Sequence, residues 1–379
     1  MLADAGILQL DLQLRLLKHG YSLKDATAFN VAFDGAHPVF IDIPSIEIPR
    51  RLDVWVAYGQ FCRMFVFPLL LHHLRGMDFK QCFLGEINGP SVESTRRMLG
   101  LTGALRPAAF VDVFLQHLLH VSAGKGENKQ DPAKFNAKVS DDPRPQELNL
   151  LRLRSKLQSI RKKSCAKSLW SSYEKTKSYD QPGDAAKTAF VKEALAECGA
   201  QSVYDAGCNT GRYSQLAAAT GARVIAADAD LDCVDVLYRS AQKDKLDILP
   251  LSLDITNPSP ALGFRHAERK SFEQRADFDC VMALALIHHL LVAARVPLPA
   301  MRDMFAALTS KWLIVEFVQP HDSMFLRLLA TRENLYEDLT PELFEEVFGN
   351  VFEIVRRQEI MNGHRVLYLM RRRAPPHAG

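Results

Sequence analysis

The sequence predicts an α/β protein in which a mainly helical first half precedes a mainly parallel sheet covered by helices. Three observations carry this prediction. A turn with two glycines, at 203–213, follows a short apolar strand and opens a helix. Apolar strands and helices then alternate up to residue 318, as in parallel βαβ units. The chain closes with two strands around Asn362 and Gly363, which indicates an antiparallel hairpin.

Residues 1–121 are expected to form the helical domain. Apolar side chains recur at helical spacing in 8–17 and again between 55 and 120. Between these regions, Asp34 and Gly35 predict a tight turn joining two short strands. Aromatic rows are more often core than ligand platforms, so the following residues are expected to pack inside the domain: Trp55, Tyr58, Phe61, Phe65 and Phe67.

The segment around that turn resembles the catalytic segment of aminoglycoside- and choline-type kinases. There, an aspartate, an asparagine and a second aspartate serve as base and magnesium ligands, and Asp25, Asn30 and Asp42 fall on these positions. Leu23 and Lys24 replace the usual His-Gly pair, and nothing upstream could form a glycine-rich loop. The resemblance implies a remnant of a kinase C-lobe, or a chain without its N-terminal part. A purely structural hairpin whose acids cap turns is the simpler interpretation.

Composition changes at 122–149, where Gly, Lys, Asn, Asp and Pro replace apolar residues, so a flexible linker is predicted. A basic connecting helix is expected at 150–169. Leucines there interleave seven basic residues, namely Arg152, Arg154, Lys156, Arg161, Lys162, Lys163 and Lys167. Two interpretations remain open: a solvated helix face, or a patch that grips nucleic acid or an anionic substrate.

The turn at 203–213 is the strongest functional signal. Because Gly207 and Gly211 have no side chains, the backbone of the turn can pass close to a ligand. Asn209 is the non-glycine residue that best tolerates a left-handed backbone. Asp205, at the strand end, would repel the pyrophosphate of a dinucleotide. S-adenosylmethionine has no phosphate and carries an ammonium, a sulfonium and a carboxylate. A carboxylate beside the turn and free backbone N–H groups at the helix start would suit it.

Residues at the ends of later strands point to the same region. Asp228 ends the second strand, seventeen residues after Gly211, where a carboxylate can accept hydrogen bonds from both ribose hydroxyls. His288 and His289 follow the fourth strand and Glu316 lies on the fifth, so all three are expected at the carboxyl edge of the sheet. One histidine could take a proton from the attacking nucleophile, with Glu316 orienting the acceptor or an imidazole.

The pattern Asp205-x-Gly207-x-x-x-Gly211 resembles the first motif of the class I methyltransferases, and the resemblance covers residues 170–375. It implies a Rossmann-like, seven-stranded domain that uses S-adenosylmethionine and ends in an antiparallel hairpin. The whole chain is similar to a methyltransferase group that includes a nodulation-associated protein of rhizobia.

This resemblance also implies roles for residues outside the glycine turn. Asp254 and Ile255 fall where the family binds adenine through an acid and an adjacent apolar side chain. Tyr173 and Lys187 become candidates to close over the cofactor.

Methyl transfer to a small molecule, saccharide or secondary metabolite is the function that the resemblance favours. The protein then mainly has to align the acceptor with the methyl group and exclude water. Two alternatives remain: an RNA methyltransferase that uses the basic helix, and a non-catalytic module that binds S-adenosylmethionine.

The overall composition bears on the partners, the metal content and the location of the protein. A net charge of +3 over 379 residues makes no case for a nucleic-acid partner. Seven cysteines without a C-x-x-C pair or zinc spacing predict reduced thiols and no metal site. The acidic start lacks the positive region of a signal peptide, and the apolar runs are too short to span a bilayer. A cytoplasmic protein without a membrane partner is expected.

Overall fold

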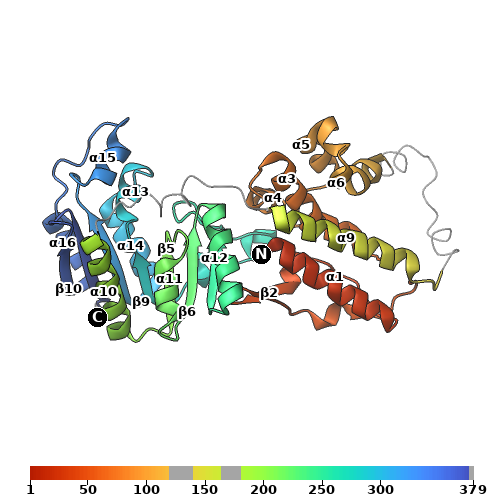
Figure 1. Cartoon of the computed structure of the whole chain (residues 1–379), viewed down its shortest axis with the longest axis horizontal. Coiled ribbons are helices and arrows are strands. Elements are labelled where there is room, and N and C mark those ends of the chain that lie inside the picture. The colour runs from red at the N-terminus through yellow and green to blue at the C-terminus, as the bar shows by residue number, and fades with distance from the viewer. Residues whose placement is uncertain (119–139, 164–180, 375–379) are drawn as a thin grey trace. The chain divides into compact units, whose positions relative to one another are not determined.

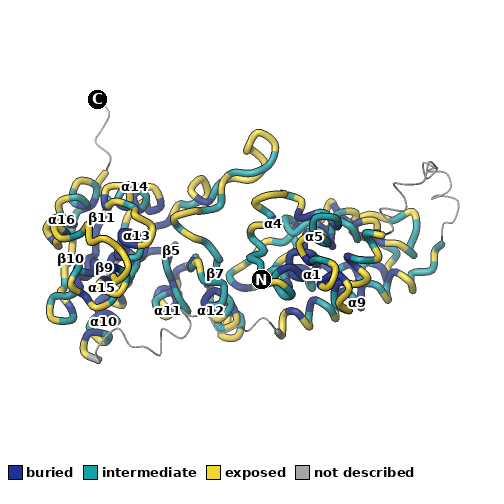
Figure 2. Tube along the Cα trace, turned by 90° about the horizontal axis from the view of Figure 1, so that it is seen from above, coloured by how far each residue is buried: buried dark blue, intermediate teal, exposed yellow. Residues whose placement is uncertain are grey.

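The computed structural model describes residues 1–118, 140–163 and 181–374. The chain divides into two compact units, Met1–Ala166 and Lys167–Gly379, and each has its own hydrophobic core. Figure 2 shows the buried positions running through the interior of each unit. No helix within the described residues is both long enough and apolar enough to cross a membrane.

The N-terminal unit is mainly helical, as predicted (Figure 1). Its helical segments are α1 (Leu2–Lys18), η1 (Ala28–Asn30), η2 (Ile43–Ser45), α2 (Tyr58–Phe61), η3 (Cys62–Val66), α3 (Phe67–Arg75), α4 (Lys80–Gly85), α5 (Val92–Ala104), α6 (Pro107–Ala109), η4 (Phe110–Leu115) and α9 (Arg144–Lys163). Its short strands are β1 (Ser22–Leu23), β2 (Val31–Asp34), β3 (His37–Phe40) and β4 (Ile46–Glu47). β1 pairs with β4 and β2 pairs with β3, both antiparallel.

The hairpin predicted at Asp34 and Gly35 is confirmed, since β2 and β3 pair across this turn. The kinase-like positions lie around it. Asn30 is buried, and its Nδ2 has no hydrogen-bond partner among the described residues. Asp42 precedes η2, where its backbone oxygen accepts from the Ser45 hydroxyl at 2.9 Å. In the ranges that the structure describes, no group of three or more His, Cys, Asp or Glu residues could hold a metal ion.

The expected aromatic packing is also present. Four of the five aromatic residues are buried, namely Trp55, Phe61, Phe65 and Phe67. The fifth, Tyr58, donates its hydroxyl to Asp112 at 2.6 Å. The row therefore belongs to the core of the N-terminal unit.

The basic helix starts earlier than expected and is part of the N-terminal unit. α9 begins at Arg144 instead of 150, because Pro145 suits a first helical turn and Asp142 accepts the Arg144 N–H at 3.1 Å. Its apolar face is buried at Leu150, Leu153, Leu157 and Ile160, whereas Leu151 is exposed. α1 approaches it closely, since a Cβ on Gly6 would lie 2.8 Å from Leu157 Cδ1. Residues 122–139 of the predicted linker lie outside the described residues.

Basic side chains of α9 are paired within the same unit. The pairs are Arg152 and Lys156 with Asp112, Arg154 with Asp11, and Arg161 with Asp4. Asp112 is fully buried. Burial raises the pKa of this carboxyl, but hydrogen bonds and charge from Arg152 and Lys156 outweigh burial and hold the pKa at about 2. Much of the predicted basic patch is therefore neutralised locally.

The C-terminal unit contains the predicted seven-stranded sheet. Its strands are β5 (Ser202–Ala206), β6 (Arg223–Asp228), β7 (Ile248–Ser252), β8 (Phe278–Ala283), β9 (Thr309–Val318), β10 (Phe352–Ile360) and β11 (Arg365–Arg372). They lie in the order β10-β11-β9-β8-β5-β6-β7. The five strands from β9 to β7 are parallel, and β11 pairs antiparallel with both β9 and β10.

One helix precedes β5, and further helical segments connect the strands that follow up to β10. They are α10 (Gln181–Cys198), α11 (Arg212–Ala218), α12 (Leu231–Asp244), η6 (Phe264–His266), η7 (Glu273–Arg275), α13 (Ile287–Val292), α14 (Leu298–Leu308), α15 (Ser323–Leu329) and α16 (Pro341–Gly349). Side chains alternate between the two faces of a strand. Tyr204 and Ala206 of β5 join the core formed with α13, α14 and α16. Asp205, between them, therefore points to the opposite face.

The terminal hairpin is confirmed. β10 and β11 pair from Ile360 and Arg365 outward. The turn between them is left-handed at Met361, Asn362 and Gly363, with φ of 55°, 52° and 83°. Three consecutive positive φ angles make a tight reversal, which explains why Asn and Gly stand there.

Candidate active site

The glycine turn lies at the point where the strand order of the sheet reverses. β5 pairs with β6 on one side and with β8 on the other, so a crevice opens at its carboxyl end. The turn has left-handed backbone at Gly207, Asn209 and Gly211, with φ of 72°, 49° and 85°. Asn209 thus adopts the conformation predicted from the sequence.

Neighbouring side chains also leave little room for a Cβ at the two glycines. A Cβ on Gly207 would lie 3.1 Å from Leu286 Cδ1, and one on Gly211 would lie 2.3 Å from Leu237 Cδ1. Real Cβ contacts are essentially never as short as the second distance. Packing against α12 therefore explains Gly211 without any ligand.

The backbone N–H groups of the turn are bonded within the protein. Gly207 and Cys208 donate to Ala227 O, Asn209 to Asp228 Oδ2, Thr210 to Asn209 Oδ1, and Gly211 to Cys208 O, all at 2.7–3.0 Å. These five N–H groups are therefore bonded to β6 or within the turn itself, whereas the prediction of free N–H groups at the helix start stays untested. The turn contributes shape and carboxylates to the site.

Asp205 is buried, with 2% of its surface exposed. Its Oδ2 accepts the hydroxyl of Ser214, on α11, at 2.6 Å. Burial raises the pKa of the Asp205 carboxyl to about 6, although the Ser214 hydrogen bond acts in the opposite direction. Asp205 therefore anchors the start of α11 as well as lining the crevice.

The two acids at the ends of the next strands are also held by the backbone. Asp228 accepts the N–H groups of Asn209 at 2.8 Å and Asp230 at 2.9 Å, and burial raises the pKa of its carboxyl. Asp254 accepts both the N–H and the hydroxyl of Thr256. Each carboxylate oxygen has a second lone pair, so both acids can still accept hydrogen bonds from a ligand.

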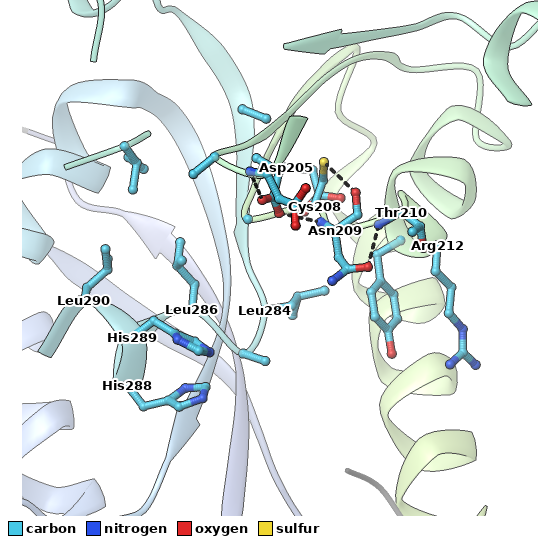
Figure 3. Close-up of a pocket in the computed structure, with 18 of the residues that line it drawn as sticks. Asp205, Cys208, Asn209, Thr210, Arg212, Leu284, Leu286, His288, His289 and Leu290 are labelled. Carbon is cyan, nitrogen blue, oxygen red and sulfur yellow. Dashed lines mark hydrogen bonds between the residues drawn. The ribbon is translucent and has the colours of Figure 1, made fainter. Parts of the chain in front are cut away.

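One cavity of about 1330 Å³ unites most of the predicted residues (Figure 3). Its walls include Lys187, Asp205, Gly207, Asn209, Asp228, Asp254, Ile255, His288 and His289. Gly211 and Glu316 are not among the lining residues. Tyr173 lies outside the described residues. A single drug-sized ligand typically occupies roughly 300–1,000 Å³, so this cavity has room for a cofactor and an acceptor.

His288 and His289 begin α13 and lie across the cavity from Thr210 and Arg212 (Figure 3). Their ring centroids are 4.3 Å apart. Burial lowers the pKa of both imidazoles, most strongly that of His288, where His289 and Arg365 lower it further. Both rings are therefore neutral at pH 7, which leaves each a lone pair for accepting a proton.

A buried chain of alternating charges lies behind the histidines. Lys187 Nζ donates to Glu316 Oε2 at 2.6 Å, and Arg365 donates to Glu316 Oε1 at 3.3 Å. Arg365 also donates to both oxygens of Asp322, at 2.8 and 3.2 Å. Asp322 in turn accepts the Met324 N–H at the start of α15. The chain thus links α10, β9, β11 and α15 through side chains that are almost completely buried.

Two of the predicted site residues, Glu316 and Lys187, belong to this chain. Glu316 does not contact the cavity, because both of its oxygens are occupied by Lys187 and Arg365. Its predicted role in orienting the acceptor or an imidazole stays a prediction. Lys187 is buried, pairs with Glu316 and lines the cavity, and its closing over the cofactor stays a prediction.

Sequence reasoning missed Arg365, Asp322 and Ser214. Arg365 is the most accessible to prediction, because it is a lone charge opening the apolar strand 366–370. Its partners could not be found from spacing, since Asp322 is 43 residues away in the chain.

The residues present fit S-adenosylmethionine as the donor. Asp228 is oriented by the N–H of Asn209, so its carboxylate is fixed beside the turn at the end of β6. Asp254 and Ile255 follow β7 and line the same cavity. Carboxylates at the ends of adjacent parallel strands suit the hydroxyls and amine of an adenosine.

One relative matches almost the whole chain in sequence. No family model matches the chain. The chain is 32% identical over 373 residues to nodulation protein NoeA of Rhizobium meliloti strain 1021, covering 98% of this chain and 78% of that protein.

Three solved structures match about half of the chain. N-methyltransferase NodS from Bradyrhizobium japonicum WM9 is 14% identical, with a TM-score of 0.38 over 52% of this chain and 99% of NodS. Magnesium protoporphyrin IX methyltransferase from Synechocystis PCC 6803 with bound SAH is 20% identical, with a TM-score of 0.37 over 51% of this chain and 86% of that one. The bifunctional kinase-methyltransferase WbdD is 14% identical, with a TM-score of 0.36 over 51% of this chain and 40% of WbdD.

The strand order, the terminal hairpin and the site at the switch point define a class I S-adenosylmethionine-dependent methyltransferase fold. The kinase-like character of the N-terminal unit stays a prediction from Asp25, Asn30 and Asp42. The chain belongs to the family of nodulation protein NoeA.

Proposed function

We propose that this protein transfers a methyl group from S-adenosylmethionine to a small-molecule or saccharide acceptor. One observation carries the proposal: a single cavity joins the turn and its acids to a pair of neutral histidines. Its volume suits two ligands side by side.

In this proposal Asp228 binds the ribose, and Asp254 with Ile255 binds the adenine. Asp205 and the left-handed turn bind the amino-acid portion of the donor. When bound, S-adenosylmethionine supplies an activated methyl carbon on sulfur. The chain's own residues align the acceptor and exclude water, and His288 or His289 takes the proton that the acceptor loses.

The alternative of an RNA substrate is disfavoured by the charge pairing of α9. Arg152, Arg154, Lys156 and Arg161 neutralise acids within their own unit. Nucleic-acid binding depends on cations that are available to phosphates. RNA binding that weakens steeply with salt would count against this argument.

The decisive experiment is to incubate the protein and labelled S-adenosylmethionine with cell extract and to identify the labelled species. A labelled small molecule or saccharide supports the proposal. Tight binding of the donor and of its demethylated product without any labelled species, across many extracts, would instead support a non-catalytic binding module.

The histidines are tested by His288→Ala and His289→Ala. Loss of a positioned base typically lowers turnover about 10²- to 10⁴-fold. One of the two variants should show a loss in this range, with donor affinity retained in calorimetry. Unchanged turnover in both variants would remove the proton-accepting role.

A further inference from the structure

Resting on the proposed function, we infer that the acceptor atom is an oxygen, of a hydroxyl or an acid group, and that it docks against His288 Nδ1. The inference concerns the acceptor end of the cavity, defined here by Lys187, His288, His289, Met324 and Arg365.

The charged side chains that line the acceptor end are cations. Lys187 and Arg365 line the cavity, whereas their carboxylate partners Glu316 and Asp322 lie behind them. The carboxylates that line the cavity elsewhere include Asp205, Asp228 and Asp254, on the side of the glycine turn. Both cations are paired with buried carboxylates, but the cations line the cavity and their partners do not, so the acceptor end favours an oxygen over an ammonium.

His288 provides a specific docking point. The side chain is 2% exposed, and its Nδ1 has no hydrogen-bond partner among the described residues. A buried polar atom without a partner costs roughly 1–3 kcal/mol. An oxygen bound at this nitrogen would remove that cost.

The protonation state of His288 agrees with an oxygen acceptor. Burial is the main cause of the lowered pKa of this imidazole. The charged and titratable groups that also act on this pKa are His289 on the same helix, Arg365 on β11, Lys187 on α10 and Glu316 on β9. Only Glu316 acts in the opposite direction. A neutral imidazole carries a lone pair that can accept the O–H of a hydroxyl or of an acid group.

A hydroxyl acceptor loses one proton and gains one methyl group. Its O–H proton passes to His288 Nδ1 while a new C–O bond forms to the methyl carbon. The C–S bond breaks, and its electron pair stays on sulfur as a neutral thioether. The imidazolium then releases its proton to water. An ionised acid oxygen follows the same path without the proton transfer.

The experiment classifies the labelled product formed from extract by its chemical stability. A methyl ether resists alkali, a methyl ester releases labelled methanol in mild alkali, and an N-methyl group survives both alkali and the acid treatment that cleaves ethers. Either oxygen product supports the inference and identifies the source of the oxygen. An N-methyl product overturns the inference but leaves the proposed methyl transfer intact, whereas no labelled product overturns both.

Two variants separate docking from folding. His288→Asn keeps a polar atom near the position of Nδ1, and His288→Leu removes it. The asparagine variant should retain more activity than the leucine variant, while both bind S-adenosylhomocysteine with wild-type affinity. Equal loss in both variants with wild-type folding would overturn the docking role.

A readout independent of turnover is the imidazole resonance of His288 in the protein without ligands. It should remain that of a neutral ring down to pH 6, because burial lowers its pKa. With a purified acceptor, kcat/KM should be nearly constant between about pH 6.5 and 8.5. A tenfold rise per pH unit over this range would indicate an ammonium acceptor and contradict the inference.

Discussion

Asp205 combines a structural and a binding role at a single residue. It is buried at the end of β5 and accepts the hydroxyl of Ser214 at 2.6 Å. A carboxylate at such a position is held in a costly ionised form, which a protein keeps only when structure or ligand binding requires it.

Asp205→Asn should weaken binding of S-adenosylhomocysteine at least about tenfold, since loss of one charge-assisted hydrogen bond costs roughly 1.5–3 kcal/mol. Asparagine can still accept from Ser214, so α11 should remain in place. Isothermal calorimetry measures the affinity and circular dichroism the fold. Affinity within a few-fold of the wild type would contradict the binding role of Asp205.

The raised pKa of Asp205 also predicts a pH dependence of stability. Its folded pKa of about 6 lies above the ordinary value of 3.8, so the folded state holds a proton that the unfolded state has lost between these values. The free energy of unfolding should therefore fall as pH rises from about 4 to 6. Thermal unfolding of wild type and Asp205→Asn over this range should show that the variant lacks this component. Parallel curves would show that Asp205 titrates normally.

At the scale of elements, α9 is docked by an apolar face and by one buried carboxylate. Leu150, Leu153, Leu157 and Ile160 supply the apolar face. The Asp112 carboxylate accepts a hydrogen bond from the Tyr58 hydroxyl and forms ion pairs with Arg152 and Lys156. Removing one member of a buried ionic cluster leaves the others uncompensated.

Asp112→Ala should lower the free energy of unfolding of the N-terminal unit by about 3–5 kcal/mol. Asp11→Ala is the matched control, because the Arg154–Asp11 pair is more than one third exposed on both sides and should contribute under about 1 kcal/mol. Urea denaturation measures both. The Asp112 contribution should persist above pH 4 and vanish as pH falls towards its pKa of about 2. Equal effects of the two variants would contradict this account.

The chain from Lys187 to Asp322 joins four elements around the acceptor end. Glu316 and Arg365 lie on the paired strands β9 and β11, two positions apart in register, which brings their side chains within reach. Lys187 reaches Glu316 from α10, so one carboxylate connects the sheet to a helix.

Lys187→Met and Glu316→Gln should therefore be strongly coupled. Each single variant leaves a charge without its partner, while the double variant removes both charges. The coupling free energy in a double-mutant cycle should be about 1–3 kcal/mol, measured by urea denaturation. Additive effects would show that the two side chains act independently.

At the scale of the whole molecule, the two units have separate hydrophobic cores. Separate cores favour separate unfolding transitions. The proposed donor site lies entirely within the C-terminal unit.

Calorimetry of the full chain should therefore show two transitions. S-adenosylhomocysteine at about 100 times its Kd should stabilise one of them by about 2.7 kcal/mol. Asp112→Ala should lower the other. A single transition that responds to both the ligand and the variant would contradict independent units.

Much of the fold could be predicted from local sequence. The strand at β5, the left-handed Asn209 and the hairpin around Gly363 follow from apolar patterning and turn chemistry, which act over a few residues. The sequence predicts that α9 starts at residue 150, six residues after its actual start at Arg144. The polar composition of 122–149 indicates a linker, and this obscures the helix-start signal of Pro145.

The sequence by itself determined the class of fold and the residues at the ends of parallel strands, because strand topology brings such ends to one edge. Only the tertiary structure decided which side chains face the cavity. It placed Glu316 behind the wall, brought Arg365 and Asp322 together across 43 residues, and occupied the N–H groups of the glycine turn. Burial and pairing depend on contacts distant in sequence, and these also set the charge of His288 and Asp205.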